Sequence, residues 1–257
     1  SLSFLKRIPD AEIPEEVKAS TGPVPWLAMA RYRPFRRLLQ TVVAWSVAYG
    51  GITAFTVAFL KTEAGMSEGK IMLVTSVAFL GGLSSLWLLG SRLDRVGSKP
   101  VLTTAFSGWI LVLGGWMALS GQALAPAMVV LLFLQVGMGL LAAVVQMSNT
   151  RLAMEVIPAM GRNHFFAIYS VVNNVTLGIA PIGWGLLIDA IGARSAKWLG
   201  LVWNHYTVFF AGASAAFALT LVLSRRLEEP KAARMEQLLH ELLVQSPLRL
   251  LSRLFPR

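Results

Sequence analysis

The amino-acid sequence predicts an all-α integral membrane protein with six transmembrane helices. Hydrophobic residues make up 55% of its 257 residues and charged residues only 14%, whereas an average globular chain carries about 25% charged residues. Six apolar stretches are each long enough to cross a hydrocarbon core of about 30 Å, and none contains Asp, Glu, Lys or Arg. Because lipid offers the backbone no hydrogen-bond partners, each stretch must be helical.

The predicted helices are separated by short connections, most of them charged. In chain order the helices span residues 38–60, 71–89, 101–119, 127–149, 165–188 and 206–223.

Three regions follow from this pattern. Residues 1–36 are rich in proline and charge and lack a helical apolar period, so they are predicted to be a cytoplasmic linker. Residues 37–224 form the predicted transmembrane bundle, and residues 225–257 form a cytoplasmic tail. Apolar residues from Met235 to Leu243 recur in the tail at helical spacing. This predicts an amphipathic helix in the membrane interface, with a solvated helix or a disordered end as the alternative.

Lysine and arginine gather on one side of the predicted topology. Residues 1–37 and 225–257 and the connections at 90–100 and 150–164 together hold 19 of the 23 Lys and Arg residues, and the opposite side holds four. The positive-inside rule therefore predicts cytoplasmic termini, in a plasma membrane or bacterial inner membrane. The net charge of +10 lies in termini and short turns, a distribution that argues against a nucleic-acid partner.

Residues for metal or covalent chemistry are scarce. The chain has no Cys, and His164, His205 and His240 are far apart in the sequence. Neither a metal site nor a cofactor is therefore expected. No His pair or Ser/His/Asp set falls at membrane depth, so an enzyme is not favoured.

Polar residues inside membrane helices are costly and indicate functional positions. In the first helix Ser46, Tyr49, Thr53 and Thr56 share one face. The corresponding stripes of the fourth and fifth helices are Gln135, Gly139, Ala142, Gln146 and Asn149, and Tyr169, Asn173, Thr176 and Ala180. Such stripes suit either a solute cavity or a tight helix interface, and their spacing leaves both open.

The connection after the second helix holds a cluster of mixed charge, LGSRLDRVGSKP at residues 89–100. It resembles the Gly-x-x-x-Asp-Arg-x-Gly-x-Lys/Arg signature in cytoplasmic loops of major facilitator superfamily transporters, although Ser98 stands where that family often has a basic residue. An ordinary positively charged turn is the alternative. The resemblance implies a conformational latch formed by Gly90, Asp94, Arg95, Gly97 and Lys99.

The same resemblance implies an architecture. A linker, six helices and a tail correspond to the central loop and helices seven to twelve of that family. The chain is therefore expected to be a C-terminal half, built as two inverted three-helix repeats, with an N-terminal six-helix half as its partner. The resemblance implies secondary active transport of a small solute by alternating access. The alternative is a six-helix scaffold or partner-binding subunit without transport of its own.

The resemblance also assigns roles to the polar stripes. In that family the first and fourth helices of each half line the central cavity, and the second and fifth meet the other half. The segment GIAPIGWGLLIDAIG of the fifth helix is similar to a glycine- and proline-rich segment of the family. The substrate-pathway candidates are Trp45, Tyr49, Thr53, Gln135 and Gln146, and the gate or interface candidates are Asn173, Gly178 and Pro181. With no charge inside the helices, an uncharged, moderately polar solute and an amphiphilic drug-like compound are both compatible.

Overall fold

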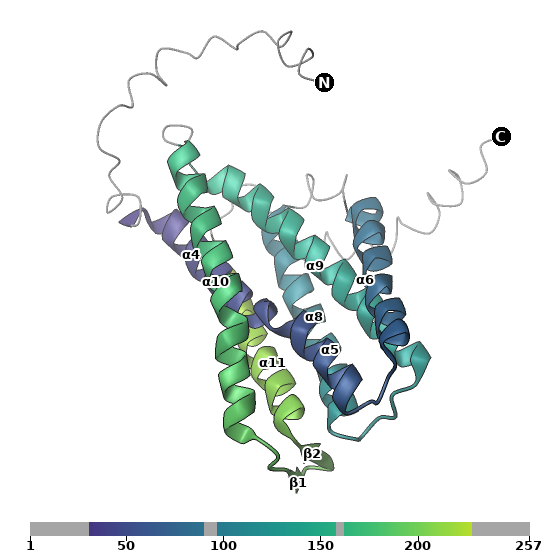
Figure 1. The fold of residues 1–257 in the computed structure, drawn as a ribbon. Helices are drawn as coiled ribbons and strands as arrows, with labels where there is room; N and C mark the ends of the chain where they lie inside the picture. The colour runs from purple at the N-terminus through teal and green to yellow at the C-terminus, as the bar shows by residue number, and fades with distance from the viewer. Residues whose placement is uncertain (1–30, 90–96, 158–161, 228–257) are drawn as a thin grey trace, which may run out of the picture.

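The computed structural model describes residues 31–89, 97–157 and 162–227. These residues form a bundle in which six helices are long and apolar enough to cross a membrane, which confirms the all-α prediction (Figure 1). Each predicted helix has a counterpart in the bundle. The helices in chain order are α4 (Arg33–Gly50) and α5 (Ile52–Thr62), which together make the first span, then α6 (Glu68–Leu89), α8 (Ser98–Ser120), α9 (Met128–Val156), α10 (Arg162–Ile191) and α11 (His205–Ser224).

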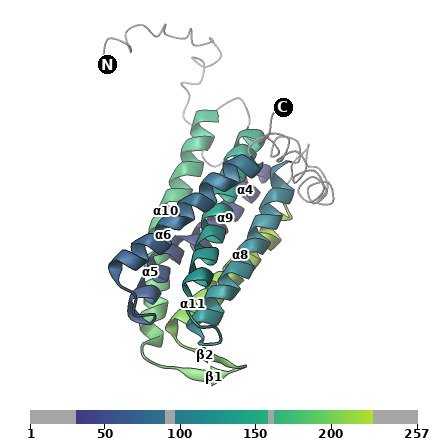
Figure 2. The ribbon, with the colours of Figure 1, turned by 90° about the vertical axis from the view of Figure 1, so that its right-hand side faces the viewer.

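The helices are arranged as a row that curves back on itself. Going along the row, α6 packs on α9, α9 on α8, α8 on α11, α11 on α4, and α4 on α10. Figure 1 shows α10 and α6 on opposite sides of the bundle, and Figure 2, turned by 90°, shows α6 in front of the other helices. These two helices are the least buried, and only 6% of the most apolar stretch of α10 is buried, against 44% for the first span.

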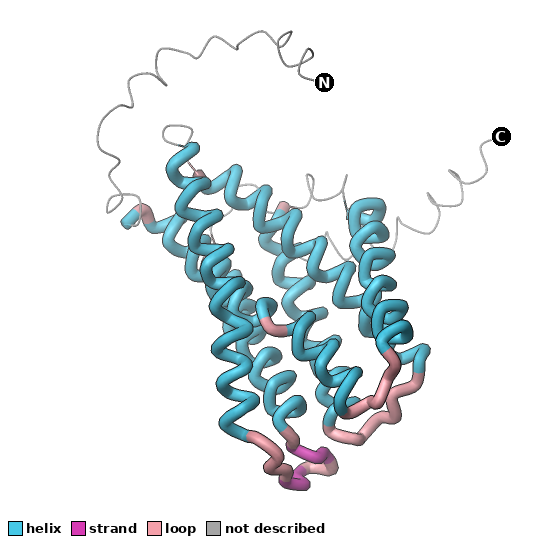
Figure 3. Tube along the Cα trace, in the orientation of Figure 1, coloured by secondary structure: helices cyan, strands magenta, loops and turns pink. Residues whose placement is uncertain are grey.

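The first span is broken at Gly51, where the sequence has two consecutive glycines (Figure 3). In a continuous helix the Gly51 N–H would donate to the Val47 carbonyl, but here it donates to Tyr49. Glycine pairs are a known cause of sharp helix bends. The apolar period alone predicted one uninterrupted helix, so this break is a feature that the hydrophobic pattern did not reveal.

Aromatic rings fill the centre of the bundle, between α4, α8 and α11. Trp109 stacks on Phe217 with ring centroids 5.0 Å apart, and Trp45 meets Phe217 edge-on at 5.6 Å. Closer to the other end, Trp116 stacks on Phe210 at 5.8 Å. Within lipid these contacts act through close packing, because lipid tails are as apolar as the side chains.

Glycines allow α6 and α9 to cross with their backbones in contact. A Cβ on Gly81 would overlap the Val136 carbonyl, and a Cβ on Gly139 would overlap the Ala78 carbonyl. Small residues at such a crossing are a common feature of membrane helix pairs. The crossing therefore depends on glycine at both positions.

A short antiparallel hairpin joins α10 to α11, formed by β1 (Ala196–Trp198) and β2 (Leu201–Trp203). It lies at the opposite end of the bundle from the start of α4 (Figure 1). These strands were not predicted, because three-residue strands carry too few positions to show alternation.

Several predicted features lie outside the described residues. They are residues 1–30 of the linker, the amphipathic tail from residue 228 onward, and Gly90, Asp94 and Arg95 of the latch.

Candidate functional site

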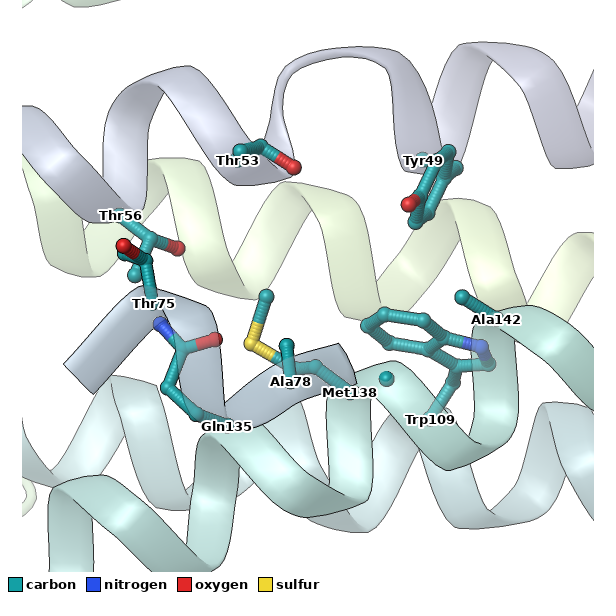
Figure 4. A pocket seen from close by; sticks show the side chains of 10 residues that line it. Tyr49, Thr53, Thr56, Thr75, Ala78, Trp109, Gln135, Met138 and Ala142 are labelled. Carbon is teal, nitrogen blue, oxygen red and sulfur yellow. The ribbon is translucent and has the colours of Figure 1, made fainter. Parts of the chain in front are cut away.

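A pocket of about 90 Å³ lies beside the α6–α9 crossing. Figure 4 shows residues of α4 and α5 on one side, facing residues of α8 and α9 on the other. The lining residues are Tyr49, Thr53, Thr56, Thr75, Ala78, Trp109, Gln135, Met138, Gly139 and Ala142.

The break at Gly51 lies within the polar side of the pocket. Tyr49 is in the last turn of α4, whereas Thr53 and Thr56 follow the break on α5. Tyr49 and Thr53 therefore line the pocket from opposite sides of the break. A bend of α5 relative to α4 would therefore change the spacing of these three hydroxyl groups.

The opposite side is built on α9. Gln135 is buried, and Met138 accepts a hydrogen bond at its Sδ from Trp116 Nε1, at 3.1 Å. Gly139 brings the α6 backbone close enough for Thr75 and Ala78 to complete the wall. The pocket is thus a direct product of the close α6–α9 crossing.

Trp109 of α8 lines the pocket between these two sides. Its ring lies 5.7 Å from the Tyr49 ring in an edge-on arrangement, and Trp45 stacks on Tyr49 at 4.7 Å. Trp45 is therefore in the layer behind Tyr49, where it holds the phenol ring in position.

Two polar atoms at the pocket lack hydrogen-bond partners among the described residues. They are Thr56 Oγ1 and Trp109 Nε1, on side chains that are 1% and 0% exposed. A buried polar atom without a partner costs free energy comparable to a lost hydrogen bond. Their presence at one pocket is typical of a place that receives water or a polar ligand.

The lining suits an uncharged ligand. Within the described part of the chain, no Asp, Glu, Lys, Arg or His lines the pocket, while hydroxyl, amide and indole groups offer both donors and acceptors. Binding pockets for small molecules usually measure about 300–1,000 Å³. The volume of this one is enough for part of a solute only.

The structure brings together three of the five substrate-pathway candidates. Tyr49, Thr53 and Gln135 line the pocket. Trp45 lies behind Tyr49, and Gln146 is an exposed residue of α9 outside the pocket.

Four lining residues were not predicted from the sequence, namely Thr75, Ala78, Trp109 and Met138. Thr75 is a polar residue of α6 that also donates to the carbonyl of its own helix, at Ile71, an arrangement that many membrane threonines adopt. Trp109 and Met138 are apolar residues in apolar helices, so only the packing of neighbouring helices reveals that they face a pocket. Thr56 was part of the polar stripe of the first span and also lines the pocket.

Two of the gate or interface candidates on α10 contact α4. Asn173 accepts a hydrogen bond at Oδ1 from Ser46 Oγ at 2.9 Å. A Cβ on Gly50 would lie 3.5 Å from Pro181 Cδ and 2.8 Å from Ala180 Cβ, so the helices are close there. A Cβ on Gly178 would meet no described atom within 4 Å.

Trp184 of α10 also contacts the break, a role that the sequence did not predict. Its Nε1 donates to the Val47 carbonyl at 2.8 Å. This is the carbonyl that loses its helical donor at Gly51. The indole therefore satisfies a backbone group that lipid could not satisfy.

The described part of the latch lies at the opposite end of α8 from the hairpin. Gly97 has a φ of 91°, a conformation that favours glycine, and it directly precedes α8. Lys99 Nζ donates to the Leu227 carbonyl, just beyond α11, at 2.9 Å. Gly90, Asp94 and Arg95 are outside the described residues.

No group of three His, Cys, Asp or Glu side chains that could hold a metal ion occurs in the described part of the chain.

The chain matches the model of a known protein family. The family model described as Major Facilitator Superfamily matches residues 39–255. No curated protein sequence matches the chain significantly.

Proposed function

Because the chain belongs to the major facilitator superfamily, we propose that it carries an uncharged small solute by alternating access, as one six-helix half of a transporter. The family consists of membrane transporters rather than enzymes, and the chain is an integral membrane protein that acts in membrane transport. The class of solute, the mechanism and the half-transporter arrangement are the proposal.

The observation that carries the solute class is the polar but uncharged pocket that residues of α4, α5, α6, α8 and α9 line. Tyr49, Thr53 and Gln135 offer hydrogen bonds, and Thr56 Oγ1 and Trp109 Nε1 lack partners among the described residues. A neutral solute with donor and acceptor groups would satisfy these atoms without bringing a charge into the membrane.

The small volume of the pocket supports the proposal that the chain is one half of a transporter. A pocket of about 90 Å³ on one bundle would hold one side of a solute, and a second six-helix bundle would supply the rest. The apolar outer surfaces of α6 and α10 would receive that bundle. Phe79 and Leu83 of α6 and Val175 and Ile182 of α10 are all exposed in the single chain.

The contacts between α10 and the first span offer a route from helix motion to the pocket. In the proposed rocking motion α10 would move with the interface, and Trp184 and Asn173 would transmit that motion to α4. The break at Gly51 lies between the Trp184 contact and Thr53. Opening and closing would therefore change the shape of the pocket.

A matched pair of glutamine substitutions tests the site. Gln135→Ala removes an amide from the pocket, whereas Gln146→Ala makes the same change on an exposed part of α9. With the chain and its six-helix partner reconstituted in vesicles, we expect Gln135→Ala to lower uptake of a transported neutral solute at least tenfold. The factor of ten corresponds to one lost hydrogen bond of about 1.4 kcal/mol. Uptake by Gln146→Ala should stay within about twofold of the unmodified chain, because this substitution removes no group from the pocket.

Two outcomes would contradict the proposal. Equal effects of both substitutions on uptake would show that the pocket is not part of the transport pathway. Absence of uptake for every neutral solute tested, with a stable complex still formed, would favour the scaffold alternative.

The latch has its own test. We expect Asp94→Asn to lower transport severalfold while membrane insertion is unchanged, because the carboxylate would favour one state through a contact with a helix end. Lys99 supports this role, since it already links the start of α8 to Leu227. Uptake is measured in vesicles, with the amount of inserted protein measured alongside. Unchanged uptake would contradict a latch at this position.

A further inference from the structure

The hairpin at one end of the bundle exposes large apolar side chains. Trp198 and Leu199 are 64% and 74% exposed. Both lie at or beside the tip, and Figures 1 and 2 show the hairpin beyond the ends of α10 and α11.

The hairpin is fixed on the bundle, so it cannot turn these side chains inward. Val202 N–H donates to the Gly121 carbonyl at 2.9 Å, and Asn204 Nδ2 donates to the Ser120 carbonyl at 2.9 Å. Trp203 Nε1 donates to the Trp198 carbonyl at 3.2 Å, which ties the two strands together. The hairpin is therefore held in place by hydrogen bonds to the end of α8 and by one between its own strands.

The residue at the tip is unusual for a turn in water. Leu199 has a φ of 53° and Gly200 a φ of 76°, so the two-residue turn has positive φ at both positions. Such turns strongly favour Asn or Asp followed by Gly, because a leucine in this region is strained. A strained and exposed leucine is best explained if the side chain itself meets an apolar environment.

Helix length places the hairpin at the membrane interface. α10 has 30 residues, or about 45 Å of helix, which exceeds a hydrocarbon core of about 30 Å. β1 begins at Ala196, shortly after α10 ends at Ile191, and α11 begins two residues after β2. Tryptophan is enriched at this depth because its ring is apolar and its N–H is polar.

The charge of the hairpin fits lipid headgroups. Between residues 190 and 204 the charged side chains are Arg194 and Lys197, both exposed, and no acidic residue occurs. Cationic side chains beside aromatic and aliphatic ones are the combination found on interfacial membrane segments.

We propose that the hairpin is a membrane-interface anchor, in which Trp198 and Leu199 insert at the boundary between headgroups and acyl chains while Arg194 and Lys197 contact lipid phosphates. The partner is the bilayer itself. This assignment does not depend on which solute is carried.

The absence of cysteine from the chain allows a direct test. Leu199→Cys carries an environment-sensitive fluorophore in the full chain, reconstituted in vesicles whose lipids bear a nitroxide near the headgroup. The matched control is Gly65→Cys, an exposed position with a similar φ of 61° where a Cβ meets no described atom within 4 Å. We expect the label at 199 to be quenched severalfold more by the lipid nitroxide, and severalfold less by aqueous iodide, than the label at 65.

A second labelled position shows whether the result depends on a local disturbance of the turn by Leu199→Cys. Trp198→Cys carries the same label next to the strained position, and it should give the same result. Iodide quenching at 198 and 199 equal to that at 65 would overturn the anchor. Shielding of both labels from both quenchers would also overturn it, because a protein surface would then cover the tip. In vesicles that contain phosphatidylglycerol, replacing Arg194 and Lys197 with Gln should lower quenching of the 199 label by the lipid nitroxide. Unchanged quenching would overturn the proposed contacts of these two residues with lipid phosphates.

Discussion

At the scale of single residues, the hydrogen bond from Trp184 to the Val47 carbonyl is the contact whose loss is simplest to interpret. Trp184→Phe keeps an aromatic ring on α10 but removes the donor at 2.8 Å from a carbonyl that Gly51 has already released. We expect the free energy of unfolding to fall by about 1 kcal/mol, the scale of hydrogen bonds between membrane helices. Thermal unfolding in detergent measures this change.

Trp87→Phe is the control for that substitution. Trp87 is a largely exposed residue of α6 with no hydrogen bond to a described residue, so the same chemical change should have little effect. Equal loss of stability in both variants would show that ring volume, and not the hydrogen bond, is responsible.

The residues of the pocket also show where sequence reasoning succeeds. Tyr49, Thr53 and Gln135 were predicted because a polar stripe on a membrane helix must face something other than lipid. Gln146 belongs to the same stripe as Gln135, but it lies one turn beyond Ala142, where the α9 side of the pocket ends, and its side chain is exposed. Trp109 and Met138 are apolar, and periodicity gives no sign that such residues face a cavity rather than a packed neighbour.

At the scale of helices, the α6–α9 crossing depends on glycine. A Cβ on Gly81 would overlap the Val136 carbonyl and lie 2.8 Å from the Leu140 amide nitrogen, and backbone atoms cannot move aside as a flexible side chain can. We expect Gly81→Ala to lower the free energy of unfolding by about 1–3 kcal/mol, as overpacking usually does. Thermal or denaturant unfolding of the purified chain in detergent checks the value.

Gly114→Ala separates this effect from the general properties of alanine in helices. A Cβ on Gly114 of α8 would meet no described atom within 4 Å, so the substitution adds helix propensity without a clash. Stability should stay equal or rise. If Gly81→Ala were equally harmless, the helices would be able to separate without cost, and the crossing would not define the pocket wall.

Helix positions were predictable because apolar length and the absence of charge identify a span almost independently of its neighbours. The break at Gly51 was harder to predict, since Gly50 and Gly51 lie in an apolar run that continues on both sides. Its effect depends on Trp184, which approaches from α10, more than 130 positions later in the chain. Long-range contacts of this kind leave no periodic signal.

At the scale of the whole molecule, the bundle divides its charges between two ends. Figure 1 shows the end of α9 and the start of α10 at the same end of the bundle as the start of α4. The hydrogen bond from Lys99 to the Leu227 carbonyl places the start of α8 beside the segment that follows α11. The other end holds Lys61, Lys70, Arg194 and Lys197, and one of these cations is already paired, because Lys61 contacts Glu68 at 3.0 Å. The positive-inside rule therefore gives a single preferred orientation.

This orientation can be measured with two single cysteines, since the chain has none of its own. Gly65→Cys lies in the exposed connection between α5 and α6, and Arg226→Cys lies in the exposed segment after α11, at the opposite end. We expect a membrane-impermeant maleimide to label position 65, but not position 226, in intact cells, and to reach position 226 once the membrane is permeabilised. The reason is that the topology predicted from the sequence assigns 19 of the 23 Lys and Arg residues to the side of position 226, and moving them across a membrane would be opposed by the membrane potential. Labelling of position 226 in intact cells would place the termini outside and reverse the assignment of the latch to the cytoplasmic face.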